Sequence, residues 1–190
     1  MFGWVLAVAS TVTVVPQSVR LYRTNDSSGI ATPTVALATA TMALWCVYTI
    51  DQADWPAFGS SVGPLVAWGV ILVWLFRNRF TRQLANSTAV ACACAVVAIA
   101  CGVPHLAAAV GSLLWALPQA YESLTNKNLQ GVSAVAFAGI AAENLGWIIY
   151  AAGTGRWAYA AAPIVQAPLA VFIASRAARA SKSGLDEEAL

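Results

Sequence analysis

Long apolar runs alternate with short polar segments along the whole chain. Seven of these runs approach the roughly 20 residues that an α-helix needs to cross the hydrocarbon core of a membrane. The pattern predicts helices over residues 2–22, 31–50, 56–76, 86–102, 104–124, 133–152 and 157–176, followed by a polar, disordered tail over 177–190. We therefore expect an all-α integral membrane protein with seven transmembrane helices.

Composition supports a membrane protein and excludes other classes. The chain is 59% hydrophobic and only 9% charged, with a mean hydropathy of +0.70, whereas about a quarter of the residues of a soluble domain are charged. The net charge of +2 is too small to indicate a nucleic-acid partner. The first apolar run has its arginines after it and none before it, so we expect no cleaved signal peptide.

Two parts of the chain are copies of each other. Pro16 and Gln17 recur as Pro118 and Gln119, at an offset of 102 residues. The same offset relates Ser10 to Ser112, Gly29 to Gly131, Trp45 to Trp147, Tyr48 to Tyr150 and Trp55 to Trp157. An internal repeat of this length indicates a repeated structural unit. We expect one three-helix unit over residues 1–78, a second over 104–176, and a linker helix within 79–103.

Basic residues predict the orientation. Nine of the ten would be cytoplasmic if the N-terminus lies outside, and only Arg156 would be external. The predicted topology is N-out and C-in. The linker helix returns the chain across the membrane, so both units insert with the same orientation and are related by a pseudo-two-fold axis along the membrane normal. A solute site is then expected between them, near mid-membrane.

Two three-helix units joined by a seventh helix, each with Pro-Gln in its first helix and Trp-x-x-Tyr in its second, resemble the PQ-loop/SWEET superfamily. The resemblance covers nearly the whole chain. It implies a 3+1+3 transporter fold, and sugar uniporters, lysosomal amino-acid exporters and a cargo receptor share this fold or a close relative. Sugar transporters usually carry an asparagine in the third helix of each unit. The nearest equivalents here are Ser60 or Ser61 and Pro163 or Ile164.

Pro16 and Pro118 each remove a backbone hydrogen bond and kink their helix. The carbonyl that is freed needs another partner in lipid, and the neighbouring amide of Gln17 or Gln119 can supply one. One interpretation is a fixed kink. The other, which the repetition and the family resemblance favour, is a hinge that lets the cytoplasmic half of each unit swing.

Trp45 and Trp147 have two interpretations. Tryptophan collects at membrane interfaces, but Trp55 and Trp157 at the predicted external helix ends fit that role better. The resemblance implies that the tryptophan three positions before each tyrosine lines the sugar site. The two indoles would then hold a pyranose ring by apolar contact.

Glu143 is the only acidic residue in the middle of a predicted span, one helical turn from Trp147. A carboxylate within the membrane is by default a candidate functional group. The alternative is a neutral acid that holds helices together through Asn144 or Gln166. We expect a substrate site that contains these residues, both tryptophans and Ser61.

An external gate is expected beyond the two tryptophans. Tyr48 and Tyr150 lie one turn further out, where the family resemblance implies closure of the external mouth. Asp54 and Arg156 follow them at equivalent positions of the two copies. We expect these charges to pair when the mouth is closed, although an exposed ion pair contributes only about 0–1 kcal/mol.

No catalytic or metal-binding constellation is present in the sequence. The four cysteines Cys46, Cys92, Cys94 and Cys101 lie within apolar runs without ligand spacing, and we expect neither a metal site nor a disulfide. His105 is expected at a solvated helix end. No nucleophile has a neighbouring base, so we expect no enzyme and no cofactor.

The sequence therefore predicts a facilitator in the cell membrane that moves a small polar solute by alternating access, with a sugar as first candidate. A proton-coupled amino-acid carrier that uses Glu143 is the second interpretation. A non-transporting receptor or structural membrane protein is the third. Membrane lipid is the other expected partner, and assembly into a homo-oligomer stays open.

Overall fold

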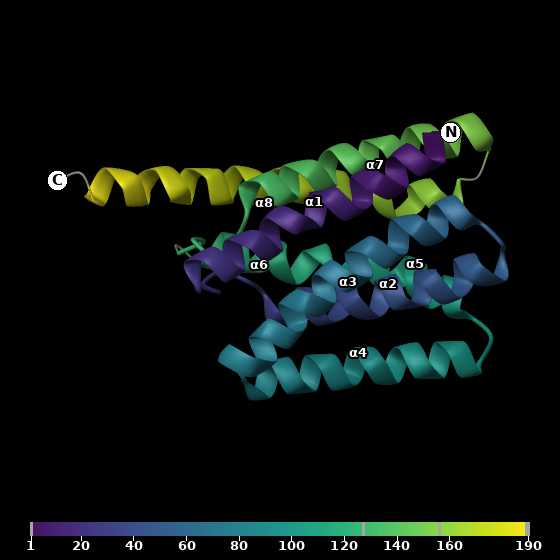
Figure 1. The fold of residues 1–190 in the computed structure, drawn as a ribbon, viewed down its shortest axis with the longest axis horizontal. Coiled ribbons are helices and arrows are strands. Elements are labelled where there is room, and N and C mark those ends of the chain that lie inside the picture. The colour runs from purple at the N-terminus through teal and green to yellow at the C-terminus, as the bar shows by residue number, and fades with distance from the viewer. Residues whose placement is uncertain (1, 127, 156, 189–190) are drawn as a thin grey trace.

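The computed structural model describes residues 2–126, 128–155 and 157–188, and within these ranges every regular element is helical. The helices are α1 (Phe2–Thr24), α2 (Thr32–Asp51), α3 (Trp55–Asn78), α4 (Arg82–Ala100), α5 (Pro104–Leu114), α6 (Ala116–Thr125), α7 (Ala134–Thr154) and α8 (Ala158–Glu188) (Figure 1). They lie side by side as an elongated bundle, with the N-terminus at one end and the C-terminus beyond the other.

Six helices in the described part of the chain are long and apolar enough to cross a membrane. They are α1, α2, α3, α4, α7 and the Tyr159–Ser181 part of α8. Each reaches the length that a hydrocarbon core requires. The length and composition of these helices are those of an integral membrane protein.

The expected helix over residues 104–124 is divided into two helices at Trp115, although Trp115 itself keeps α-helical angles (φ −62°, ψ −29°) and its N–H donates to the carbonyl of Gly111 at 2.9 Å. α5 ends at Leu114 and α6 begins at Ala116, with Trp115 between them. Pro118 explains the break, because it has no N–H to donate to the carbonyl of Leu114 and its ring crowds that carbonyl. Pro16 occupies the equivalent position in α1, which nevertheless continues as one helix.

The prediction of a disordered tail is also wrong for the described residues. α8 continues to Glu188, and Ala177 is fully buried. Alanine, arginine and lysine dominate residues 177–182, and these residues have high helix propensity. Residues 189 and 190 lie outside the described residues.

The helices pack in a repeated order. α3 contacts both α1 and α2, while α8 contacts α7 on one side and α5 and α6 on the other. Contacts between the two groups join α1 to α7 and α2 to α5. α4 packs on α2 and α5 at the edge of the bundle (Figure 1). Only 17% of the most apolar stretch of α4 is buried inside the protein.

The two Pro-Gln glutamines bind loops of the opposite group of helices. Buried Gln17 donates from Nε2 to the carbonyl of Gly131 (2.8 Å) and accepts from the amide of Ser133 (2.6 Å). These two hydrogen bonds differ from the expectation that the glutamine amide donates to the carbonyl freed by the adjacent proline.

The second glutamine repeats the same arrangement in the other direction. Buried Gln119 donates to the carbonyl of Gly29 (2.7 Å) and accepts from the amide of Ala31 (2.9 Å). Gly29 and Ala31 are the 102-residue equivalents of Gly131 and Ser133. We call these four hydrogen bonds the crossed glutamine clamps.

Glycine is required where the two loops meet. Gly29 has φ +76°, and a Cβ there would lie 2.7 Å from Cδ2 of Leu129. A Cβ on Gly131 would lie 2.6 Å from the carbonyl oxygen of Ser28, which accepts from the Gly131 amide at 3.0 Å. Any side chain at either position would push the loops apart.

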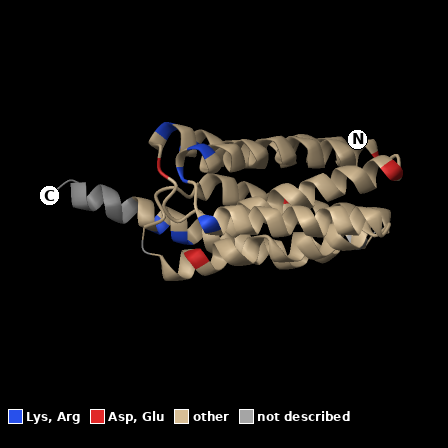
Figure 2. Cartoon of the chain, turned by 90° about the horizontal axis from the view of Figure 1, so that it is seen from below, with Lys and Arg blue, Asp and Glu red and all other residues tan. Residues whose placement is uncertain are grey.

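Lysine and arginine residues gather at the end of the bundle that contains these loops (Figure 2). Among the described residues they include Arg20, whose Nε donates to the carbonyl of Gln130, and Arg176, whose Nε donates to that of Ser123 at 2.9 Å. We call this the basic end.

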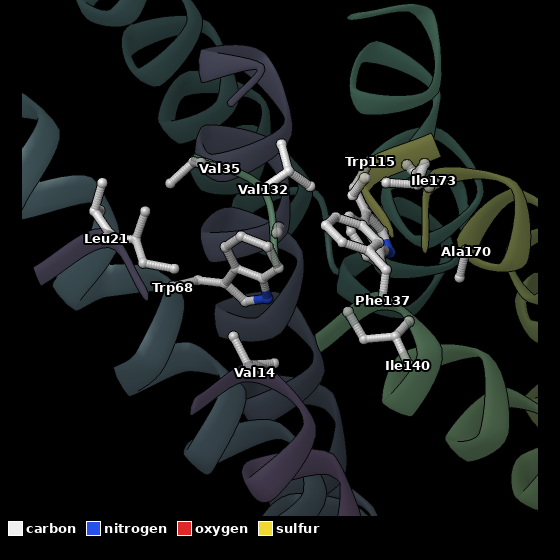
Figure 3. Packing of buried hydrophobic residues seen from close by; sticks show 14 of the residues in the cluster. Val14, Leu21, Val35, Trp68, Trp115, Val132, Phe137, Ile140, Ala170 and Ile173 are labelled. Atoms are coloured by element: carbon white, nitrogen blue, oxygen red, sulfur yellow. The ribbon is translucent and has the colours of Figure 1, made fainter. Parts of the chain in front are cut away.

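The interior next to the basic end is filled by a continuous apolar core. Trp68 and Trp115 lie at its centre, with ring centroids 5.8 Å apart. Figure 3 shows them surrounded by side chains from both groups of helices, including Val14, Val132, Phe137 and Ile173. Close packing of this kind separates the cavity described below from the basic end.

The crossed glutamine clamps should contribute measurably to stability. Gln17→Ala and Gln119→Ala each leave a buried carbonyl and a buried amide without a partner, and each such group costs about 1–3 kcal/mol. We expect each variant to lower the free energy of unfolding by at least that amount in thermal or denaturant unfolding of the purified protein. Gln130→Ala, an exposed glutamine in the same region, is the matched control. Equal stability of all three variants would contradict the role of the clamps.

Candidate functional site

A cavity of about 110 Å³ lies between the two groups of helices, in the part of the bundle away from the basic end. All six residues predicted for the substrate site line it. Its lining residues are Met42, Trp45, Thr49, Ala57, Ser60, Ser61, Ser112, Glu143, Asn144, Trp147, Tyr159, Ala162, Pro163 and Gln166. The structure thus brings the predicted residues together, while binding itself stays a prediction.

Glu143 joins α7 to α1. Its Oε1 accepts from Ser10 (2.5 Å) and from the indole Nε1 of Trp147 (3.0 Å), and its Oε2 accepts from Thr13 (3.2 Å). The carboxyl group therefore bridges helices, as the structural alternative in the sequence analysis supposed. Its three partners lie on α1 and on its own helix.

The partners proposed for Glu143 from the sequence bind elsewhere. Asn144 donates to the carbonyl of Ile140 (2.9 Å), and Gln166 donates to the carbonyl of Ser112. Both amides thus satisfy backbone groups of the helices that line the cavity. The expected pairing of Glu143 with either of them is wrong.

Two protonation states of Glu143 fit this geometry equally well. The Ser10 hydroxyl is 2.9 Å from the carbonyl of Leu6, and the Thr13 hydroxyl is 3.0 Å from that of Ser10. Each hydroxyl has one proton, which can point to its backbone carbonyl or to the carboxyl group. An ionised Glu143 accepts both protons, whereas a protonated Glu143 donates to a hydroxyl that has turned to the backbone. Neither state leaves a buried polar group without a partner.

Both indole N–H groups are bonded, but the two halves of the cavity differ. Nε1 of Trp45 donates across the boundary to the hydroxyl of Ser112 at 2.8 Å, whereas that of Trp147 donates to Glu143 of its own helix. The position equivalent to Glu143 is Thr41, which is 2% exposed and packs against Gly111 of α5. The cavity therefore has a carboxyl group on one side only.

Tyr159 is a cavity residue that the sequence analysis missed. Its ring centroid lies 6.3 Å from that of Trp45, 5.8 Å from that of Trp147 and 6.1 Å from that of Tyr150. The ring is thus a common neighbour of both indoles, and a pyranose held by the two indoles requires Tyr159 to move. The equivalent residue in the first copy is Ala57. That departure from the repeat is the signal that would have identified it.

Aromatic rings also surround the end of the cavity away from the basic end. Tyr48 packs against Trp45 (5.7 Å between centroids) and against His105 (5.6 Å), and Tyr150 packs against Trp147 (5.5 Å). His105 is exposed, as expected, and contacts Tyr48 as well. These rings lie at the second end of the cavity.

Asp54 links the start of α3 to this aromatic cluster. Its Oδ1 caps α3 by accepting from the amide of Ala57 (3.2 Å), and its Oδ2 accepts from the hydroxyl of Tyr159 (3.0 Å). Arg156, its predicted partner, lies outside the described residues. Asp54 thus belongs to the expected gate region through Tyr159.

Comparisons with known proteins assign the chain to no family. No family model matches the chain, and no curated protein matches it.

Tyr159→Phe should loosen the aromatic end of the cavity. The variant keeps the ring contacts but loses the hydrogen bond to Asp54, which contributes about 1 kcal/mol net and corresponds to about a fivefold shift in an opening equilibrium. We expect about fivefold faster thiol labelling of Ser60→Cys in purified protein whose four native cysteines are replaced. Tyr121→Phe, an exposed tyrosine of α6, is the control. An unchanged labelling rate would show that the Tyr159 hydroxyl does not restrain the opening.

Proposed function

We propose that this protein is a membrane transporter of a small polar solute that works by alternating access between two three-helix units. The units are residues 1–78 and 104–176, and α4 is the linker. One observation carries the proposal: a cavity with several polar side chains lies on the boundary between the units, with the apolar core toward the basic end and aromatic rings toward the other. Relative rotation of the units opens one end or the other.

The packing of the helices supports this mechanism. Only two pairs of helices among those in substantial contact, α1 with α7 and α2 with the α5–α6 segment, join the two units directly. Both pairs flank the cavity, because residues of α2, α5 and α7 line it. A small rotation at this boundary therefore changes access to the cavity without disturbing the packing inside either unit.

The distribution of charge supports an orientation. The basic end holds the described arginines near the loops, and the N-terminus lies at the opposite end (Figure 2). Because basic loops are retained in the cytoplasm, the basic end is cytoplasmic and the aromatic end external in this proposal. The cell membrane is the proposed location.

The two copies of the Pro-Gln element support the hinge. α1 continues through Pro16, whereas the equivalent helix is interrupted at Trp115, before Pro118. Trp115 itself keeps α-helical angles (φ −62°, ψ −29°), so the second copy is interrupted at the proline without leaving the helical path. In this proposal the helix bends where proline removes a backbone hydrogen bond.

A sugar was the first candidate solute from the sequence, and the aromatic rings with the serine and amide groups of the cavity support a small polar molecule. Proton coupling is the second candidate, because Glu143 has hydrogen-bond partners in both of its protonation states. Uptake of labelled glucose, alanine and choline into proteoliposomes tests the transport function. Binding without uptake of any of them would favour a receptor.

Removal of the hinge prolines should impair transport. Pro16→Ala and Pro118→Ala restore a backbone N–H and straighten the helix, so kink and mobility are lost together. We expect each variant to fold and to transport at least several-fold more slowly than the wild type in the proteoliposome assay. Pro33→Ala is the control, because Pro33 lies in the first turn of α2, where proline does not interrupt the helix. Wild-type rates in both hinge variants would disprove the hinge.

Glu143→Gln separates proton coupling from packing. Glutamine keeps the shape, its oxygen can accept and its NH2 group can donate to a hydroxyl that has turned to the backbone, but it cannot exchange a proton at accessible pH. If Glu143 carries a proton, we expect the variant to lose accumulation of labelled alanine driven by an imposed pH gradient while it keeps exchange. Glu122→Gln is the control, since Glu122 of α6 lies outside the cavity and accepts from Asn126. Unchanged pH-driven accumulation in Glu143→Gln would exclude proton coupling at this residue.

A further inference from the structure

The charge of the cavity is unbalanced. Among the described residues that line it, Glu143 is the one acidic residue, and none is lysine, arginine or histidine. A solute that carries a carboxylate or phosphate would lie near Glu143 without a basic partner in this lining. Burial of two like charges without compensation is strongly unfavourable. The lining therefore disfavours anions.

Three hydroxyl groups of the cavity offer acceptors rather than donors. Thr49 donates its proton to the carbonyl of Trp45 (2.7 Å), and Ser60 and Ser61 donate theirs to that of Ala57 (2.7 and 3.0 Å). A hydroxyl whose proton is used still has lone pairs available. These three groups therefore present negative dipole ends to a ligand.

The side-chain amides of the cavity also form hydrogen bonds within the protein. Asn144 and Gln166 each use an N–H for a backbone carbonyl. A hexose needs partners for several hydroxyl groups that donate and accept, and few uncommitted donors remain here. A ligand with positive charge and few acceptors matches the remaining polar surface better.

Three aromatic rings complete the lining. Both indole N–H groups are already bonded, to Ser112 and to Glu143, so Trp45 and Trp147 present carbon surface to the cavity. Tyr159 lies within 6.3 Å of both indoles, centroid to centroid. Rings grouped in this way attract ammonium groups through their negative faces, which is the basis of aromatic cages for quaternary ammonium ions.

Size is consistent with such a ligand. The cavity of about 110 Å³ is several times larger than the roughly 10–15 Å³ that a single water needs. Choline is a smaller molecule than a hexose and needs less of this space.

We propose that the cavity binds a small organic cation, a primary to quaternary ammonium compound of about the size of choline. Its ammonium group lies against Trp45, Trp147 and Tyr159, and the ionised carboxylate of Glu143 is its counter-ion. Ser10, Thr13 and the Trp147 indole hold that carboxylate in place by donating to it. The proposal names the solute of the transport function above and rests on that function only for the movement of the cation, not for its binding.

The test compares two ligands of the same shape in the unaltered protein. Choline and dimethylbutanol, in which carbon replaces the nitrogen, differ in charge and hardly in size. We expect choline to raise the midpoint of thermal unfolding and to bind at least about tenfold more tightly than dimethylbutanol, as expected for a cation in an aromatic site. Equal binding of the two, or tighter binding of glucose, would overturn the proposal without any variant having to fold.

Variants then assign the cation to this site. We expect Glu143→Gln and Trp147→Leu each to weaken choline binding about tenfold or more, whereas Tyr159→Phe, which keeps the ring, should change it less than Tyr159→Leu. Glu122→Gln, outside the cavity, should bind choline as the wild type does. Wild-type affinity in Glu143→Gln and Trp147→Leu would place the cation elsewhere and overturn the assignment.

Uptake separates this proposal from the transport function. Choline binding without choline uptake into proteoliposomes would support the cation site and contradict transport. Glucose or alanine uptake without choline binding would support transport and contradict the cation site.

Discussion

A buried backbone amide or carbonyl without a hydrogen-bond partner is costly, and the loops before α2 and α7 bury two such groups each. The crossed glutamine clamps satisfy all four. Because each glutamine belongs to the opposite group of helices, neither loop reaches its final form until the two groups meet. The clamps thereby join the groups at the basic end, next to the apolar core. The space left between the groups lies toward the other end, where the cavity is found.

Residues that are the same in both copies set the helix arrangement around the cavity, and residues that differ between the copies give the cavity its distinctive chemistry. Trp45 and Trp147 occupy equivalent positions, and both of their indole N–H groups are bonded, one to Ser112 and the other to Glu143. Glu143 has Thr41 as its counterpart, and Tyr159 has Ala57. A symmetric cavity would present the same groups to a ligand from both sides. These two differences between the copies instead place a carboxyl group on one side of the cavity and one tyrosine ring next to both indoles. An asymmetric ligand therefore has a preferred orientation.

The sequence predicted the helical membrane class and six of the fourteen residues that line the cavity. Helix length, apolar composition and equal depth in a repeat can be read from the position of a residue in the chain. The sequence did not predict the partners of Gln17 or Glu143, since those depend on which helices become neighbours. Tyr159 was missed for a related reason: it lies at a helix start, and no motif marks it. The interruption at Trp115 was not predictable from Pro118 alone, because Pro16 in the same context leaves α1 continuous.

The position of the prolines relative to the clamps constrains how the bundle can move. Rigid separation of the two groups at the basic end would break all four clamp hydrogen bonds and expose the core around Trp68. Each proline, however, immediately precedes a clamped glutamine in the chain. Bending at Pro16 or Pro118 therefore lets one part of the helix move while the glutamine stays bound to the opposite loop. A carrier needs access states that differ by only a few kcal/mol, and a bend that preserves the clamps keeps the difference smaller than a separation that breaks them.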